Sequence, residues 1–261
     1  MPDTANALLQ VEDLSRHFGG LAALDHVSFA VAPGTICGLI GPNGAGKTTL
    51  INIISGLLPL SSGRILFDGA PVNGLPAHEL ARRGIGRTFQ NIRLFGDLTV
   101  LENVMVGHHL RQPGTILETV LRLPRSRQAE RATRAKALAL LRRLRLEHLA
   151  PAPAAALSYG DQRRVEIARA LALEPRLLLL DEPAAGMIGA ETDQLAEFLV
   201  QLRAAGLTLL VIEHSMELIM SICDQVVVLN FGRTIAAGPA DRVHNDPQVI
   251  EAYLGAEQAE V

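Results

Sequence analysis

The chain has 261 residues, of which 48% are hydrophobic and 20% are charged, and its formal net charge is −3 at pH 7. A chain of this length can bury a sizeable core in one or two domains. Because positive and negative charges nearly balance, the composition argues against a strongly basic surface, and we expect no nucleic-acid partner.

The first part of the chain predicts a group of short strands. Apolar and polar residues alternate over residues 8–14 and 23–31, as they do in half-buried strands, and residues 64–69 show a similar pattern. We expect these three segments to form a small antiparallel sheet.

A second group of strands is typical of a buried parallel sheet. These strands are nearly continuous apolar runs, as strands covered on both faces are. They occupy residues 35–41, 177–183, 207–214 and 224–230. Helical patterns lie between them at residues 47–58 and 190–206. This alternation indicates βαβ units, so we predict an α/β fold with a parallel core sheet.

Residues 90–175 differ from the rest because they lack strand-like runs. The Leu and Ala spacing of residues 127–150, which are also rich in Arg, fits an amphipathic helix. Its basic residues could touch nucleic acid or lipid, but a solvated charged face is the simpler interpretation. We predict a helical subdomain at about residues 90–175, inserted into a core formed by about residues 1–89 and 176–261.

The cysteine and hydropathy patterns bear on the compartment. Cys37 and Cys223 lie far apart in contexts without ligand spacing, which argues against a disulfide framework or a metal cluster. Residues 1–10 carry no basic region, and no later segment approaches the roughly 20 apolar residues of a membrane span. We expect a soluble cytoplasmic protein whose membrane role, if it has one, comes through partners.

The strongest chemical motif lies at residues 41–48, where the sequence fits G-x-x-x-x-G-K-[ST] between a predicted strand and a predicted helix. Glycines let the backbone fold around phosphate, so that N–H groups and the helix N-terminus face the anion. A lysine can then neutralise the β- and γ-phosphates, and hydroxyls can reach Mg²⁺ and a phosphate further back. We predict an ATP–Mg²⁺ site that includes Gly41, Pro42, Asn43, Gly44, Ala45, Gly46, Lys47, Thr48 and Thr49.

Two acids end the predicted strand at residues 177–183. Asp181 is placed to hold Mg²⁺ through the hydration shell of the ion, and Glu182 can polarise a water in line with the γ-phosphate. Taken alone, the pair could be a solvent-exposed acidic turn. With the phosphate loop upstream, we interpret Glu182 as a catalytic base and Asp181 as a metal ligand.

A third motif carries a family resemblance. Residues 157–171, Leu-Ser-Tyr-Gly-Asp-Gln-Arg-Arg-Val-Glu-Ile-Ala-Arg-Ala-Leu, resemble the signature of ABC ATPases and the helix that follows it. The resemblance covers nearly the whole chain and implies the P-loop NTPase fold of that family, in which two cassettes pair head to tail around ATP. Ser158 and Gly160 would then face the γ-phosphate held by a partner cassette. Tyr159 and Asp161 depart from the common form beside these groups.

The same resemblance assigns three further positions. Gln90 matches the glutamine that reaches Mg²⁺ and the attacking water, and His214 matches the switch histidine that contacts the γ-phosphate. Phe18 resembles the aromatic residue that stacks on adenine. In isolation these would be read as a polar loop residue, a structural histidine and a core phenylalanine.

One position departs from the family pattern in a way that matters for a dimer. After Glu182-Pro183 the family usually has Asp or Asn, but the equivalent residue here is Ile188, which cannot bridge polar groups between subunits. We hypothesise that the ATP site depending on this loop is less tightly coupled.

The closest resemblance is to ATPase subunits of branched-chain amino acid importers of the LivG type. It rests on residues 16–29, 84–107, 158–172, 181–187, 211–220 and 249–255. It implies a second ATPase subunit, two membrane permeases, a periplasmic binding protein, and a place on the cytoplasmic face of the inner membrane. Urea and short-amide importers use similar cassettes, and a soluble ABC ATPase outside transport shares every ATP motif. A phosphotransfer or regulatory P-loop enzyme would lack residues 157–162.

Overall fold

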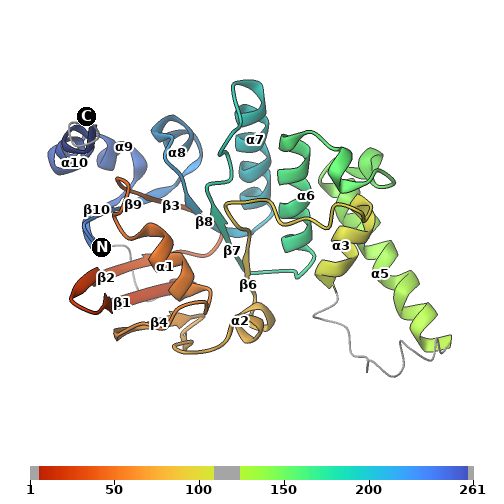
Figure 1. Cartoon of the computed structure of the whole chain (residues 1–261), viewed down its shortest axis with the longest axis horizontal. Coiled ribbons are helices and arrows are strands. Elements are labelled where there is room, and N and C mark those ends of the chain that lie inside the picture. Colours follow the sequence, from red (N-terminus) through yellow and green to blue (C-terminus); the bar gives the residue numbers. More distant parts are fainter. Residues whose placement is uncertain (1–5, 109–123, 258–261) are drawn as a thin grey trace. The chain divides into compact units, whose positions relative to one another are not determined.

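The computed structural model describes residues 6–108 and 124–257 (Figure 1). It divides into two compact units, one made of residues 1–90 and 176–261 and the other of residues 91–175. We refer to them as the core unit and the helical unit.

The core unit contains the predicted antiparallel sheet, with strand order β2-β1-β4-β5. Its strands are β1 (Leu9–Phe18), β2 (Leu21–Val31), β4 (Ser62–Phe67) and β5 (Ala70–Pro71). Leu9 of β1 pairs with Val31 on one side and Phe67 on the other, and all three side chains are buried. The apolar residues of the alternating pattern are thus the ones on the covered face of this sheet.

The second sheet of the core unit has the order β10-β9-β3-β8-β7-β6. Its strands are β3 (Ile36–Ile40), β6 (Ile85–Arg87), β7 (Leu177–Asp181), β8 (Thr208–Ile212), β9 (Gln225–Asn230) and β10 (Arg233–Gly238). The pairs formed by β3, β6, β7, β8 and β9 are parallel, and β10 pairs antiparallel with β9 at the edge. Every residue of β3, β7 and β8 is buried, which confirms the parallel core sheet.

Two strands of this sheet had no clear sequence signal. Strand β6 has three residues, too few to show a period, and β10 is only partly buried at the edge. Both are set by pairing with a neighbouring strand rather than by their own composition.

Six helices flank the sheets of the core unit in its described residues: α1 (Lys47–Ile54), α2 (Ala77–Arg83), α7 (Ala190–Ala204), α8 (Met216–Ile222), α9 (Ala240–His244) and α10 (Pro247–Glu257). Helix α1 is shorter than the predicted 47–58. It ends where Gly56 takes a φ of 72° and the Leu57 N–H bonds the Asn52 carbonyl, a Schellman-type stop. Figure 1 shows α9 and α10 beside β10, near the end of the described chain.

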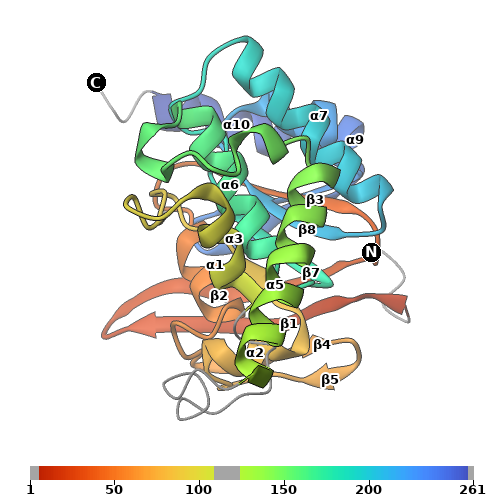
Figure 2. The ribbon, with the colours of Figure 1, turned by 90° about the vertical axis from the view of Figure 1, so that its right-hand side faces the viewer.

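The helical unit is built from α3 (Val100–His108), α5 (Pro124–Arg143) and α6 (Tyr159–Leu171), with short 3₁₀ turns at Glu147–Leu149 and Ala154–Ala156. Helix α5, the long green helix of Figure 2, packs against α3. The predicted helix at residues 127–150 is therefore correct in type, but it stops at Arg143. The chain reverses there because Arg145 takes a φ of 59° and the Leu146 N–H bonds the Leu141 carbonyl.

Close packing of α3 on α6 depends on one glycine. A Cβ added to Gly107 would lie 2.2 Å from the carbonyl oxygen of Arg169, a backbone atom that cannot swing away. We expect Gly107→Ala to lower the free energy of unfolding by about 1–3 kcal/mol, the usual cost of overpacking. Denaturant unfolding would measure it. The matched control is Gly96→Ala in the same unit, whose added Cβ would meet Ala155 at an ordinary 3.4 Å; equal effects of the two changes would refute the packing argument.

Both cysteines are free in the structure, and Cys37 is buried within β3. Burial raises the pKa of the Cys37 thiol to about 12 and also raises the pKa of Cys223. Both thiols therefore behave as packing groups, as expected from their contexts.

Candidate active site

The phosphate loop connects β3 to α1, and its glycines are required by close backbone approach. Gly41 has a φ of 148°, and a Cβ there would lie 2.1 Å from the Leu229 carbonyl oxygen. Gly46 has a φ of 101°, and its Cβ would meet the Ala23 carbonyl oxygen at 2.7 Å. The loop is thus held between β9 and β2, and other residues at these positions would move it.

Lys47 begins α1 and is 6% exposed. Its ammonium donates to the carbonyl oxygens of Gly41 at 2.6 Å and Pro42 at 2.9 Å. Burial lowers the pKa of Lys47, and the nearby carboxylates of Glu182 and Asp181 act in the opposite direction. The lysine is therefore held by the loop itself, with its charge beside the two acids.

A cavity of about 410 Å³ opens over this loop. It is lined by residues 21–23, residues 43–49, Glu182, His214, Phe231 and Gly232. Backbone N–H groups at a helix start, a buried cation and two hydroxyls form a donor set suited to a polyphosphate. Of the predicted loop residues, 43–49 line the cavity, while Gly41 and Pro42 support Lys47 from behind.

The three predicted catalytic residues meet in one hydrogen-bonded group. Glu182 Oε2 accepts from Gln90 Nε2 at 2.7 Å, and Glu182 Oε1 lies 2.6 Å from His214 Nε2. Glu182 and His214 follow the adjacent parallel strands β7 and β8, whose carboxyl ends share one edge of the sheet. Glu182 takes a φ of 47°, a rare conformation for a residue with a side chain. The turn therefore aims this carboxylate into the cavity.

Two buried ionic residues at this edge escaped sequence reasoning. Glu213 accepts from the backbone N–H of Ala184 at 2.7 Å and of His214 at 3.2 Å, and burial raises its pKa. Arg87 donates to Asp181 Oδ2 at 3.0 Å. For Glu213 the available signal was an acid directly after the apolar run of β8. Arg87 had no such signal, because β6 is too short to show a strand pattern and the contacts of Arg87 join distant parts of the chain.

The adenine end of the site differs in detail from expectation. Phe18 is 44% exposed, with the Arg16 guanidinium 4.5 Å from its ring centroid, and it is not among the residues that line the cavity. Its cross-strand neighbour Leu21 does line the cavity. Phe231, which is 85% exposed, lines it as well, although no sequence motif pointed to it. Leu21 and Phe231 thus give this cavity two large apolar side chains from different segments of the core unit.

In the helical unit, Ser158 is the N-cap of α6. Its hydroxyl oxygen accepts from the Asp161 N–H at 3.2 Å and donates to Asp161 Oδ2 at 3.0 Å. The N–H and the carboxylate of Asp161 thus both bond the Ser158 hydroxyl, so Asp161 supports the N-cap of α6. Gly160 lies in the first turn of the helix.

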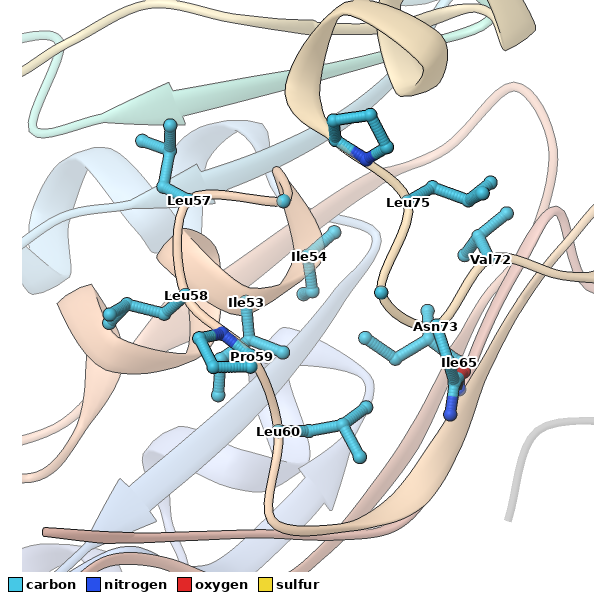
Figure 3. Close-up of a pocket in the computed structure, with 13 residues that line it drawn as sticks. Ile53, Ile54, Leu57, Leu58, Pro59, Leu60, Ile65, Val72, Asn73 and Leu75 are labelled. Atoms are coloured by element: carbon cyan, nitrogen blue, oxygen red, sulfur yellow. Dashed lines mark hydrogen bonds between the residues drawn. The ribbon is translucent and has the colours of Figure 1, made fainter.

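A second hollow, of about 290 Å³, lies elsewhere in the core unit, and most of the side chains that line it are apolar (Figure 3). Ile54, Leu60 and Leu75 face it in Figure 3, and none of its lining residues carries a charge. The side chain of Asn73, its amide residue, is bonded to the backbone of Ile65 and Gly63. The cavity over residues 43–49 differs from this hollow because Lys47, Glu182 and His214 are among its lining residues.

Residues 24–185 match the family model described as ABC transporter. The chain belongs to the ABC transporter ATP-binding family. Residues 233–259 also match the model described as Branched-chain amino acid ATP-binding cassette transporter. The phosphate loop, the signature and the Asp181-Glu182 pair thus lie in the first match, and the C-terminal part of the cassette lies in the second.

Known relatives align with this cassette over almost its full length. It is 43% identical to the high-affinity branched-chain amino acid transport ATP-binding protein BraF of Pseudomonas aeruginosa and to LivG of Escherichia coli, covering 95% of this chain and 98% of each relative. A solved ATP-binding cassette of an ABC transporter in its ADP conformation is 35% identical, with a TM-score of 0.84 over 95% of this chain and 99% of that one.

Membership in the family confirms three predictions. The fold is that of an ABC ATPase cassette, the cassette binds ATP, and it hydrolyses ATP to power transport. Cassettes of this family work as dimers with transmembrane permease subunits. In residues 6–108 and 124–257, no helix is both long and apolar enough to span a bilayer.

Proposed function

We propose that this cassette powers the uptake of branched-chain amino acids. The observation that carries the proposal is the match of residues 233–259 to a cassette model specific to branched-chain amino acid transporters. Identities of 43% to BraF and LivG support it. The cassette does not touch cargo itself, so its subfamily is what points to the solute.

The proposed assembly contains a second ATPase subunit, two membrane permeases and a periplasmic solute-binding protein. The cassette would sit peripherally on the cytoplasmic face of the cell membrane. Ser158 and Gly160 would complete the ATP site of the partner cassette, because a capped helix start favours the γ-phosphate. We also propose that the chain has two subdomains. Along the sequence, the helical subdomain at about residues 90–175 is inserted between the two segments that form the core.

The catalytic roles follow from the geometry. Glu182 would accept a proton from the attacking water, while Gln90 and His214 hold its two oxygens and orient it. Lys47 and the loop N–H groups would neutralise charge on the phosphates. These groups come from four different segments of the core unit, which follow β3, β6, β7 and β8, so the site depends on the fold being intact.

The residues present also fit Mg²⁺. Thr48, Gln90 and Asp181 offer a hydroxyl, an amide and a carboxylate oxygen, the hard donors that Mg²⁺ prefers. Among the described residues no group of three or more His, Cys, Asp or Glu could hold a metal, which agrees with an ion held by few protein ligands and by phosphates. Held by these residues, Mg²⁺ would supply positive charge that offsets the negative charge of the phosphates.

Reconstitution tests the cargo. The cassette would be placed in liposomes with the permeases and binding protein of the proposed assembly, and ATPase activity would be followed as solutes are added. We expect leucine, isoleucine or valine to stimulate hydrolysis and urea or acetamide not to. Stimulation by urea or a short amide alone would assign the other cargo class. A cassette that never co-purifies with membrane proteins would instead be a soluble ABC ATPase.

The loop after Glu182 contains Ile188, on which the proposed weak coupling of one ATP site depends. Ile188 is 82% exposed, and Gly189 follows it with a φ of 48° and a ψ of −119°. An exposed isoleucine offers no polar bridge to a partner. We expect Ile188→Asn to raise ATPase cooperativity, with a coupling of roughly fivefold, the lower end of allosteric effects. Initial rates over a range of ATP concentrations would measure it.

The control for this change is Ile250→Asn, at another exposed isoleucine of the core unit. It should leave both the rate and the cooperativity unchanged. If Ile188→Asn also leaves both unchanged, the proposed weak coupling is wrong.

A further inference from the structure

Arg87 links two elements of the nucleotide site. Its side chain, on β6, is 9% exposed. Nη1 donates to Asn52 Oδ1 and to Ser55 Oγ, both at 2.7 Å, and Nη2 donates to Asp181 Oδ2 at 3.0 Å. One guanidinium thus binds the C-terminal turn of α1 and the last residue of β7.

The two elements that Arg87 joins each carry a proposed Mg²⁺ ligand. Thr48 is in the first turn of α1, and Asn52 lies four residues later, on the same face of that helix. Asp181 ends β7, and its side chain is 6% exposed. The separation of the Thr48 hydroxyl from the Asp181 carboxylate therefore depends on how α1 sits against the end of β7, and Arg87 bonds both.

An arginine suits this task for physical reasons. Its guanidinium is rigid and planar, so Nη1 and Nη2 point in fixed directions relative to each other, one toward α1 and the other toward Asp181. The bond to Asp181 is charge-assisted and buried, where such bonds are strong and where an unpaired carboxylate would be costly. The guanidinium also lies 5.1 Å from the ring centroid of Phe89, the residue before Gln90. A lysine could keep the charge but could not reproduce these two fixed directions.

We propose that Arg87 is a positioning residue that sets the spacing between Asp181 and α1 and thereby the affinity of the nucleotide site for Mg²⁺. The inference rests on the proposed roles of Asp181 and Thr48 and does not depend on the cargo. Outer contacts of this kind typically change metal affinity by 10- to 100-fold when they are removed.

The test measures the binding of a fluorescent ATP analogue by the full chain, first in EDTA and then over a Mg²⁺ titration. Arg87→Met should change the dissociation constant measured in EDTA by no more than about twofold. It should raise the Mg²⁺ concentration that gives half of the maximal change in nucleotide binding by about 10-fold or more. Arg87→Lys should fall between it and the unchanged protein. The matched control is Arg176→Met, which removes an exposed ion pair with Asp68 in the same unit and should change neither value.

Two outcomes would overturn the inference. One is an unchanged Mg²⁺ requirement in Arg87→Met, and the other is an equal loss of binding with and without Mg²⁺, which would make Arg87 a purely structural residue. If Arg87→Met does not fold, Arg87→Lys and Asn52→Ala decide the matter, because Asn52→Ala removes an α1 bond and keeps the ion pair. A normal Mg²⁺ requirement in both would refute the proposal.

Asp181→Asn separates this inference from the metal assignment on which it rests. If Asp181→Asn does not alter the Mg²⁺ requirement, the proposed metal site is wrong. If Asp181→Asn raises the requirement and the Arg87 variants do not, the metal site stands and the positioning role of Arg87 is wrong.

Discussion

Glu182→Gln is expected to slow ATP turnover by about 10²- to 10⁴-fold, the usual contribution of a general base. Glutamine has nearly the same size as glutamate, but its amide cannot take a proton from water. It also presents an NH₂ group to either Gln90 Nε2 or His214 Nε2, where a carboxylate oxygen now lies. Phosphate release would give the turnover rate.

ATP binding should survive this change, because Lys47 and the loop N–H groups are untouched. A fluorescent ATP analogue would measure binding separately from hydrolysis. The matched control is Glu197→Gln, an exposed acid on α7. If Glu182→Gln hydrolyses ATP at the normal rate, Glu182 is not the base.

Lys47→Ala should have the largest effect on binding itself. The change removes a buried cation and two bonds, to the carbonyl oxygens of Gly41 and Pro42. Hydrogen bonds to charged groups contribute about 1.5–3 kcal/mol each, so losing the contacts to two phosphates should weaken ATP binding by roughly 10²- to 10⁴-fold. Titration calorimetry or fluorescence would measure it.

The chain offers a simple control, since its one other lysine is Lys136, an exposed residue of α5. Lys136→Ala removes the same charge and should bind ATP normally. If Lys47→Ala binds ATP within threefold of the unchanged protein, Lys47 does not neutralise the phosphates as proposed.

Much of the fold could be predicted from local patterns. Strands β3, β7 and β8 are covered on both faces, so their continuous apolar runs were visible in the sequence. The prediction was less accurate at helix ends. The apolar pattern predicts that helix α1 continues to residue 58, because Leu57 and Leu58 extend it. The helix ends earlier because Gly56 adopts the left-handed conformation. End positions depend on caps that apolar periodicity does not record.

The site divides in the same way. Lys47 lies in a contiguous motif, so it was found without a structure. Arg87 was not found, because its partners Asn52 and Asp181 are 35 and 94 residues away. Phe231 reaches the cavity only because the β9–β10 turn lies against the phosphate loop, where the Gly232 N–H bonds the Ala45 carbonyl.

The amino-acid sequence by itself determined that this chain has a P-loop nucleotide site, because three glycines and a Lys-Thr pair lie within eight neighbouring residues after a predicted strand. The resemblance of residues 157–171 to the ABC signature then separated it from other P-loop proteins. Only the tertiary structure decided which distant groups complete the site. It joined Gln90, Glu182 and His214 and tied Asp181 to α1 through Arg87. The reason is that hydrogen bonds act over about 3 Å, and which distant residues come within that range depends on how the chain packs.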